Sequence, residues 1–317
     1  SGARLAERGE FTKRAFLNGR LDLTQAEAVI DLIKAKSDKS FDVALEQLEG
    51  ALSAKIKDIR ALLVDVLVNL TVNIDYPDED IEEMTYEKLF KDVSNIRDYI
   101  DNLLKTADTG KILNEGLKVS IVGKPNVGKS SLMNALIGEN RAIVTDIPGT
   151  TRDTIEETIS VRGIPVVITD TAGIHETDDL IEQIGISKSK ESFNNADLII
   201  FVIDSSQELS LEDFDIMKHI GERNTIVLLN KTDKGQVVLR KQIVNEIKNV
   251  FIIESAVSKG IGIKELADRI EDLVYAGKVN QQNSVMVTNV RHERILKEAF
   301  TAAGDALQMI EMKQPLE

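Results

Sequence analysis

Apolar residues recur at steps of three and four from Thr24 to about Thr109, which is the period of amphipathic helices. Thr24, followed three residues later by Glu27, predicts a capping box for a helix that extends through Ile33. The pattern then predicts a single helix of roughly 35 residues, about 50 Å long. Its apolar stripe comprises Phe41, Leu45, Leu48, Leu52, Ile56, Ile59, Leu63, Val66, Leu70 and Ile74.

A further helix is predicted beyond Pro77 and the acidic run Asp78–Glu83, which end the long helix. Thr85 can cap this further helix at its N-terminus. Its apolar face comprises Leu89, Val93, Ile96, Ile100 and Leu103. We interpret these helices as parts of the core of a helical bundle.

From about Leu117 to Ala276 the pattern changes to short β-rich runs, most of them separated by helical patterns. This alternation is typical of a doubly wound α/β sheet. A short turn at Arg162–Ile164 separates the second and third runs, which predicts a hairpin and hence one antiparallel edge strand. The predicted strands are Leu117–Val122, Ile155–Val161, Pro165–Thr169, Leu198–Ile203, Thr225–Leu229 and Val250–Ile253.

A polar stretch at Gln281–Ser284 follows the α/β segment, and Val290 to Glu311 then reads as one more amphipathic helix. Because a lone helix needs a partner, we expect it to return to the N-terminal bundle. The predicted fold class is a mainly parallel α/β domain with one antiparallel edge strand, inserted into an all-α helical-bundle domain. The expected boundaries are residues 1–114 and 278–317 for the helical domain and 115–277 for the α/β domain.

The composition of this chain of 317 residues limits its possible binding partners and cellular location. Its net charge of -14 repels nucleic acid in general, so any RNA contact needs a local patch or a partner. The absence of cysteine excludes disulfides and thiolate metal sites and fits a cytoplasmic location. No apolar run is long enough to span a bilayer, so no membrane association is expected. The chain begins with Ser1 rather than Met, which predicts a fragment or a processed chain.

The glycine-rich segment Gly123–Ser130, GKPNVGKS, matches the P-loop pattern between a strand and a helix. Its backbone N–H groups would wrap the phosphates of a nucleotide. Lys129 would reach the β- and γ-phosphates, and Ser130 would bind Mg²⁺. The nucleotide contacts predicted here are Asn126, Val127, Gly128, Lys129, Ser130 and Ser131.

Three further motifs follow later strands. In Asp170-Thr171-Ala172-Gly173, Asp170 is a candidate Mg²⁺ carboxylate, and the Gly173 amide can face the γ-phosphate. In Asn230-Lys231-Thr232-Asp233, a carboxylate at Asp233 would pair with the N1–H and exocyclic amine of guanine and thereby select GTP over ATP. Ser255-Ala256 can supply a backbone N–H to the guanine oxygen. Since parallel sheets bind ligands at the carboxyl ends of their strands, these motifs together predict a guanine-nucleotide site for GTP or GDP.

The polar segment Thr145–Asp153 lies between the P-loop and the hairpin and is predicted to be a switch loop. Thr151 is the candidate for a Mg²⁺-binding threonine that senses the γ-phosphate, and Thr150 is a predicted nucleotide contact.

The order of these motifs resembles that of the translation-factor-like GTPases, and Ile143–Asp153 is similar to the branch that contains Era, EngA and MnmE. The segment Gly9–Ala28, GEFTKRAFLNGRLDLTQAEA, resembles the start of the helical domain of the MnmE family, which Era and EngA lack. The resemblance covers essentially the whole chain, and the implied activity is GTP hydrolysis.

The resemblance to the MnmE family also implies a role in tRNA wobble-uridine (U34) modification together with the flavoprotein MnmG. Members bind a folate cofactor in an N-terminal domain that also holds a constitutive dimer, and they end in a cysteine motif. We expect this chain to lack both the folate domain and the cysteine motif. The tRNA chemistry would then require the full-length protein.

The resemblance further implies a hydrolysis mechanism. Ile174 occupies the position at which Ras-like enzymes place a water-orienting glutamine. MnmE-like proteins use K⁺, here matched to Asn126, Thr145 and Ile147, in a site formed when two GTPase domains form a homodimer. The family's water-orienting glutamate matches Glu182, so the implied catalytic residues are Glu182, Lys129 and Gly173.

Other interpretations remain open at this level. Asn126 is also typical of a turn with unusual backbone angles, and Glu182 also fits an exposed acidic helix start. Arg152, His175 and His292 are expected to be polar surface. The alternative functions are a nucleotide-gated interaction switch with slow turnover and a ribosome-assembly GTPase of the Era or EngA type.

Overall fold

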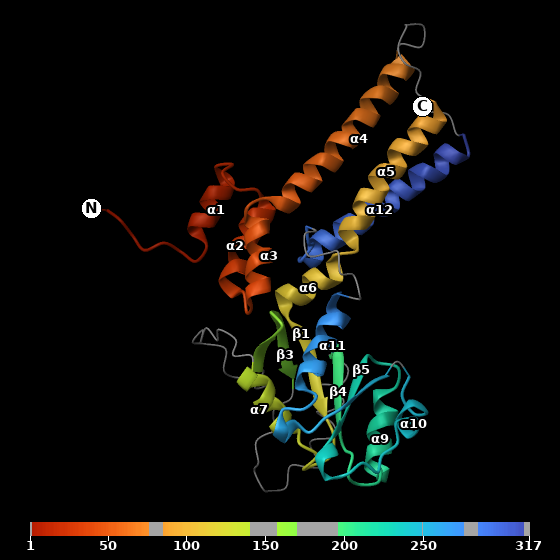
Figure 1. The fold of residues 1–317 in the computed structure, drawn as a ribbon. Helices are drawn as coiled ribbons and strands as arrows, with labels where there is room; N and C mark the ends of the chain where they lie inside the picture. Colours follow the sequence, from red (N-terminus) through yellow and green to blue (C-terminus); the bar gives the residue numbers. More distant parts are fainter. Residues whose placement is uncertain are drawn as a thin grey trace. The chain divides into compact units, whose positions relative to one another are not determined.

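The computed structural model describes residues 2–75, 85–139, 157–169, 196–248, 250–275 and 285–313. The chain divides into two compact units, which we consider separately (Figure 1). The helical unit comprises Ser1–Ala35, Phe41–Asn114 and Lys278–Glu317. The α/β unit comprises Lys36–Ser40 and Glu115–Gly277.

The helical unit is built around three long helices, of which α5 packs against both α4 and α12 (Figure 1). The helices of this unit, in chain order, are α1 (Glu10–Leu17), α2 (Leu23–Lys34), α3 (Asp38–Leu48, whose first turn belongs to the α/β unit), α4 (Ala51–Asp75), α5 (Tyr86–Leu104), α6 (Ala107–Glu115) and α12 (Val290–Glu311). The prediction that the last helix returns to the bundle is confirmed by a shared core. That core contains Leu52, Ile59, Val66, Leu89, Val93, Ile96, Ile100, Leu103, Ala107, Val287, Leu296, Leu307 and Ile310.

The prediction of a single helix of about 35 residues is wrong, because the helix is interrupted between Leu48, which ends α3, and Ala51, which begins α4. Gly50 adopts a φ of 93°, a left-handed conformation that interrupts the helix. The Gln25 side chain donates from Nε2 to the Leu48 carbonyl oxygen over 2.9 Å and so satisfies the end of α3. The apolar period continues across this break, which is why the pattern alone did not reveal it.

The capping box of α2 also differs from the prediction. Asp22, not Thr24, is the N-cap residue, and its Oδ1 accepts from the Gln25 N–H over 2.9 Å. The Gln25 Oε1 accepts in return from the Asp22 N–H over 3.0 Å. Thr85 does cap α5, since its hydroxyl oxygen accepts from the Lys88 N–H.

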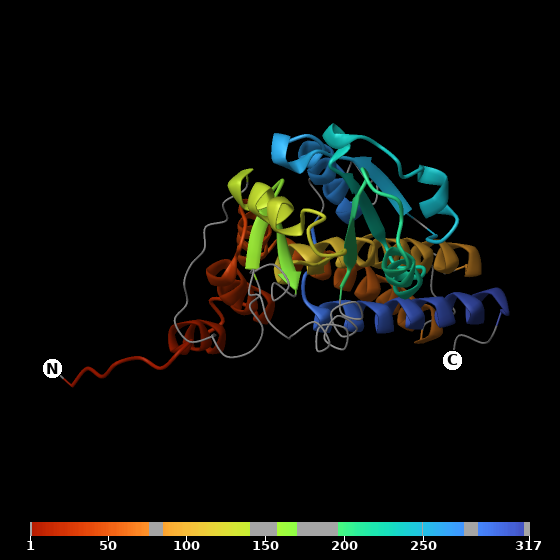
Figure 2. The same ribbon diagram turned by 90° about the horizontal axis from the view of Figure 1, so that it is seen from below.

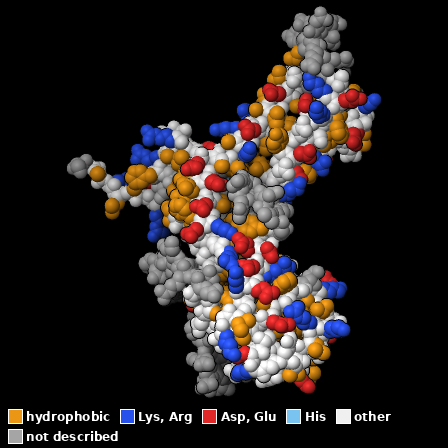
Figure 3. Space-filling view, in the orientation of Figure 1, with side chains coloured by type: hydrophobic (Ala, Val, Ile, Leu, Met, Phe, Trp, Pro, Cys, Tyr) orange, Lys and Arg blue, Asp and Glu red, His pale blue; other side chains and the backbone are white. Residues whose placement is uncertain are grey.

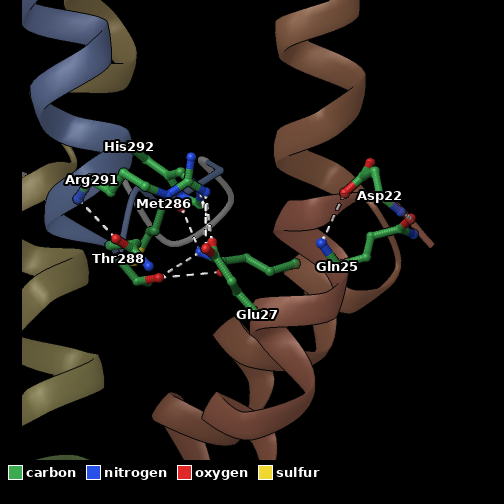
Figure 4. A network of polar contacts seen from close by, with 9 residues as sticks. Asp22, Gln25, Glu27, Met286, Thr288, Arg291 and His292 are labelled. Carbon is green, nitrogen blue, oxygen red and sulfur yellow. Dashed lines mark hydrogen bonds and ion pairs between the residues drawn. The ribbon is translucent and has the colours of Figure 1, made fainter. Parts of the chain in front are cut away.

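A polar network joins the chain entering α12 to the N-terminal helices (Figure 4). Gln47 of α3 donates from Nε2 to the Met286 carbonyl oxygen over 3.0 Å and to the Thr288 hydroxyl oxygen over 2.9 Å. Arg291 donates to both carboxylate oxygens of Glu27, over 3.0 and 2.9 Å. Glu27 therefore anchors α12 to α2 instead of serving as a capping residue.

His292 belongs to the same network and is buried, which corrects the expectation of a surface residue. Its Nε2 lies 2.8 Å from Arg291 Nη2 and 3.1 Å from Glu27 Oε2, whereas its Nδ1 is buried with no partner among the described residues. In the neutral ring, Nε2 accepts from Arg291. Burial and the neighbouring Arg291 cation lower the pKa of His292 and outweigh the opposite effects of Glu27 and Asp31.

We expect the helical unit to lose stability as the pH falls below the ordinary histidine pKa of 6.5. The unfolded chain takes up a proton at this position more readily than the folded chain, because the folded pKa is lowered. The stability is therefore fully present above 6.5 and declines as the pH falls toward the folded pKa.

Hydrogen exchange of α2 and α12 between pH ~7.5 and ~5.5 measures this loss, after correction for the intrinsic exchange rate. His292→Gln should flatten the dependence, whereas His219→Gln, which changes an exposed histidine in the α/β unit, should not. An identical pH profile for the parent and His292→Gln would contradict the assignment.

The α/β unit is a six-stranded sheet with the order β2-β3-β1-β4-β5-β6. Only β2 and β3 pair antiparallel, and the other neighbours are parallel, which confirms the predicted fold class. The strands are β1 (Leu117–Val122), β2 (Glu157–Val161), β3 (Ile164–Thr169), β4 (Leu198–Asp204), β5 (Thr225–Asn230) and β6 (Val250–Glu254).

Helices cover both faces of this sheet (Figure 2). On one face, α9 (Leu211–Ile220) and α10 (Arg240–Val244) pack through an apolar cluster that includes Ile199, Phe201 and Ile203 of β4. α7 (Lys129–Glu139) and α11 (Ile263–Tyr275) contact each other and β2 on the opposite face. Within the part of the chain that the structure describes, no helix is long and apolar enough to cross a membrane.

Candidate nucleotide-binding site

The P-loop connects β1 to α7, as the sequence predicts. Two of its positions must be glycine, because neighbouring atoms leave no room for a Cβ. Gly123 has a φ of 147°, and a Cβ there would overlap the Val202 carbonyl of β4. Gly128 has a φ of 109°, and a Cβ there would overlap the Asn230 side-chain amide. The loop is thereby held against the carboxyl ends of β4 and β5, where this class of sheet binds ligands.

Lys129 begins α7, and its ammonium group turns back into the P-loop. Nζ donates to the carbonyl oxygens of Gly123 and Lys124 over 2.6 and 2.7 Å. Burial lowers the pKa of Lys129, an effect that the Glu212 carboxylate partly offsets. The ammonium group thus lies within the loop that would surround the phosphates, where an anionic ligand would favour its charged form.

Asn230 and Lys231, at the end of β5, brace the P-loop from the side. Asn230 donates from Nδ2 to the Val127 carbonyl over 2.8 Å, and its Oδ1 accepts from the Val257 N–H over 3.0 Å. Lys231 donates from Nζ to the Asn126 carbonyl over 2.6 Å. These two side chains therefore connect the predicted phosphate loop to the predicted base-binding loops.

Asp204 completes this brace, although the sequence analysis did not single it out. It ends β4, and its Oδ2 accepts from Lys231 Nζ over 2.7 Å while Oδ1 accepts from the Ser206 hydroxyl over 2.6 Å. Burial would raise the pKa of Asp204, but the hydrogen bonds from Lys231 and Ser206 outweigh it and hold the pKa below its ordinary value. A carboxylate at the carboxyl end of a parallel strand is the signal that would have identified it.

A second buried carboxylate, also missed, holds the P-loop through Lys124. Asp213 of α9 is 1% exposed, and its Oδ2 lies 2.6 Å from Lys124 Nζ. The same oxygen accepts from the Ser210 backbone N–H and hydroxyl over 2.8 and 2.9 Å. Both ends of the segment between β4 and α9 are thus tied to the P-loop.

The predicted base-binding residues lie on two loops that follow β5 and β6. Asp233 lies in a short 3-10 helix at Thr232–Lys234, and its Oδ2 is 3.1 Å from Lys259 Nζ. The Ser255 N–H donates to the Leu229 carbonyl over 2.8 Å, and the Ala256 N–H donates to the Ile261 carbonyl over 3.2 Å. Thr232 donates its hydroxyl and its N–H to the Ser255 carbonyl, which joins the two loops.

Asn126 has a φ of 61°, which gives it the conformational role that the alternative interpretation assigned to it. Ser130 and Ser131 lie in the first turn of α7. The remaining predicted site residues lie outside the described residues. These are Thr145, Ile147, Thr150, Thr151, Asp170, Thr171, Ala172, Gly173 and Glu182.

A P-loop braced by an Asn-Lys-x-Asp motif, on a sheet with this strand order, defines a P-loop GTPase. Comparison with known families specifies the class further. The family described as "MnmE helical domain" matches residues 23–317. The chain therefore belongs to the MnmE family, which confirms the resemblance seen in the sequence.

Curated relatives agree with this assignment. The tRNA modification GTPase MnmE of Clostridioides difficile (strain 630) is 54% identical over 314 residues, which are 99% of this chain and 68% of the relative. The protein of the same name from Bacillus subtilis (strain 168) is 47% identical over 317 residues, covering 100% of this chain and 69% of the relative.

Among solved structures, a GDP·AlF4⁻-bound Era variant from Aquifex aeolicus is 30% identical over 48% of this chain and 55% of its own, with a TM-score of 0.35.

Proposed function

We propose that this GTPase acts in tRNA wobble-uridine (U34) modification and that its hydrolysis is activated by K⁺-dependent pairing of two GTPase domains. The observation that carries the nucleotide part is the pair of hydrogen bonds from Asn230 and Lys231 to the P-loop, which supports a role for the motif Asn230–Asp233 in nucleotide binding. The tRNA part is supported by the relatives, which are named tRNA modification GTPases. We further propose that the α/β unit is the GTPase domain.

In this proposal, the P-loop binds the phosphates of GTP, and the loops that follow β5 and β6 bind the guanine base. Lys129 would leave the carbonyls of Gly123 and Lys124 for the β- and γ-phosphates. The Asp233 carboxylate would accept from the N1–H and exocyclic amine of guanine, and Lys259 would keep that carboxylate charged. The guanine oxygen would compete with Ile261 for the Ala256 N–H, whose present bond is long, and Ser255 would support that loop.

The residues assigned to Mg²⁺ are Ser130, Thr151 and Asp170. Two hydroxyls and a carboxylate are oxygen donors of the kind that Mg²⁺ prefers, and Ser130 lies in the first turn of α7, directly after Lys129. The ion, when bound, neutralises charge on the phosphate oxygens. In this proposal the chain's own residues bind the triphosphate and keep it in a fixed orientation.

The K⁺ part of the proposal rests on Asn126, Thr145 and Ile147, which match the family's ligands. Among them the structure describes Asn126, whose side chain is exposed and whose carbonyl is held by Lys231. A monovalent cation at the phosphates offsets negative charge there without a side chain. Pairing of two GTPase domains would close such a site from solvent.

We expect GTP hydrolysis to be at least about tenfold faster in KCl than in NaCl at matched ionic strength. The stimulation should grow with protein concentration, because two domains must meet to form the cation site. The measurement is the initial rate of phosphate release per molecule over a concentration series. Equal rates in both salts at every concentration would remove the K⁺ mechanism and leave a GTPase with slow turnover.

We expect Glu182→Ala to slow hydrolysis by about tenfold or more and to leave GTP affinity unchanged, because a water-orienting residue acts on the chemical step and not on binding. Single-turnover hydrolysis and the affinity for a fluorescent GTP analogue separate the two effects. Asp179→Ala, a nearby acidic residue, is the matched control. A normal single-turnover rate in Glu182→Ala would show that the assignment is wrong.

The proposed partners and setting follow from the family and are properties of the full-length protein. They are the flavoprotein MnmG, a tRNA reached through the complex, and a folate cofactor that supplies the one-carbon unit. The proposed location is the cytoplasm, where a tRNA-modification enzyme meets its tRNA.

A further inference from the structure

Asp213, in the first turn of α9, is a buried carboxylate whose charge is balanced by a lysine of the P-loop. It is 1% exposed, and its Oδ2 lies 2.6 Å from Lys124 Nζ. Its Oδ1 is also buried and has no hydrogen-bond partner among the described residues. Charged side chains of both signs are scattered over the visible surface of the α/β unit, where water screens them (Figure 3). Asp213 lacks that screening, so the loss of Lys124 would leave an uncompensated charge inside the protein.

The backbone carbonyls of the P-loop accept hydrogen bonds from protein side chains. The acceptors are the carbonyls of Gly123, Lys124, Asn126 and Val127, and the donors are Lys129, Lys231 and Asn230. Backbone N–H groups of such a loop then remain available for the phosphates. Because the ammonium group of Lys129 rests on the carbonyl of Lys124, a displacement of the Lys124 backbone would also displace Lys129.

The side chain of Lys124 is well suited to hold this backbone in place. Pro125 follows it, and a proline fixes its own φ and restricts the residue before it to extended conformations. Lys124 Nζ donates to the Ser210 hydroxyl over 3.0 Å, and that hydroxyl donates to Asp213 Oδ2 over 2.9 Å. These three side chains therefore form a closed polar network that fixes the start of the P-loop to α9.

We propose that Lys124 and Asp213 are positioning residues for phosphate binding, and that their ion pair holds the P-loop backbone where Lys129 and the loop N–H groups meet the β-phosphate. Neither side chain contacts the nucleotide. The inference rests on the proposed nucleotide site and adds to it a support on α9 that lies outside the nucleotide motifs. GTP and GDP share the β-phosphate, whereas GMP lacks it, so the effect of the ion pair should appear with GTP and GDP and not with GMP.

Competition against a fluorescent GDP analogue tests this with a slowly hydrolysed GTP analogue, GDP and GMP. We expect Lys124→Met to weaken binding of the GTP analogue and of GDP by at least about tenfold each, and of GMP by less than about twofold. Lys124→Arg keeps the charge and should recover most of the lost affinity. Lys248→Met is the control for loss of a lysine, because it removes an exposed ion pair with Glu222 in the same unit, and it should leave all three affinities unchanged.

Asp213→Asn tests whether the two residues act as one pair. The amide keeps an acceptor for the Ser210 N–H at the start of α9 but loses the charge that pairs with Lys124. Each single variant and the double variant Lys124→Met/Asp213→Asn should weaken GDP binding by the same factor. The double variant leaves no buried charge, so it measures the effect even if a single variant is unstable. Additive losses would show that the residues act separately and would overturn the proposal.

Lys129→Ala separates a failure of this inference from a failure of the proposed site. Weak GDP binding in Lys129→Ala together with parent affinity in Lys124→Met would overturn the inference and leave the site in place. Parent affinity in both variants would reject the site and the inference with it. A loss of GMP affinity as large as the loss of GDP affinity in Lys124→Met would show a general loosening and would also overturn the inference. Hydrogen exchange of β4 and β5 confirms that each variant is folded.

Discussion

Replacing Asp233 with asparagine is expected to weaken GTP binding by about 100- to 1,000-fold, because two charge-assisted hydrogen bonds to guanine are lost. The asparagine amide would present a donor to a base edge that also presents donors. Xanthine carries a carbonyl where guanine carries the exocyclic amine, so Asp233→Asn should bind xanthosine triphosphate better than GTP. Competition of both nucleotides against a fluorescent GDP or XDP analogue measures the change.

The ion pair between Asp233 and Lys259 provides the control for this experiment. Lys259→Ala removes the cation, 3.1 Å from the carboxylate, but leaves the carboxylate itself. This variant should therefore retain its preference for GTP, with only a modest loss of affinity. Unchanged GTP affinity in Asp233→Asn would mean that Asp233 does not contact the base.

The sequence predicted the α/β unit well because its elements are local and its motifs are anchored to strand ends. Each of the six strands was placed within a few residues. Lys129 and Asp233 could be proposed as nucleotide-binding residues because their motifs have fixed spacing. Asp204 and Asp213 were missed because their roles arise from side chains that meet only in the folded sheet. Asp204 meets Lys231 across β4 and β5, and no spacing rule connects the two.

The helical unit was predicted less accurately because the period of apolar residues does not reveal where a helix is interrupted. The stripe from Phe41 to Ile74 continues in phase through Gly50, and only the left-handed backbone at that glycine divides the helix. His292 was expected at the surface because a polar residue next to an arginine in the sequence is usually exposed to solvent. Its burial depends on Glu27, which lies 265 residues earlier in the chain.

Replacing Gly110 with alanine is expected to destabilise the helical unit by about 3 kcal/mol, because the added methyl group has no space. Gly110 lies within α6, so alanine suits its backbone, but a Cβ would overlap the Val287 carbonyl. That backbone cannot move away easily, since the Val287 N–H donates to the Thr106 hydroxyl over 3.1 Å and Gln47 holds both neighbouring residues.

Gly304→Ala is the opposite case in the same unit and distinguishes crowding from a general effect of glycine substitution. Gly304 lies inside α12, and a Cβ there would have only Arg97 Nε in reach, at 4.0 Å. Alanine should therefore stabilise the helix by roughly 0.5 to 1 kcal/mol through its better helix propensity. Hydrogen exchange of α5 and α12 reports both variants without interference from the α/β unit. Unchanged exchange in Gly110→Ala, together with slower exchange in Gly304→Ala, would mean that the segment at Val287 can shift to make room for the methyl group. The hydrogen bonds from Thr106 and Gln47 would then contribute little to holding α12 in the bundle.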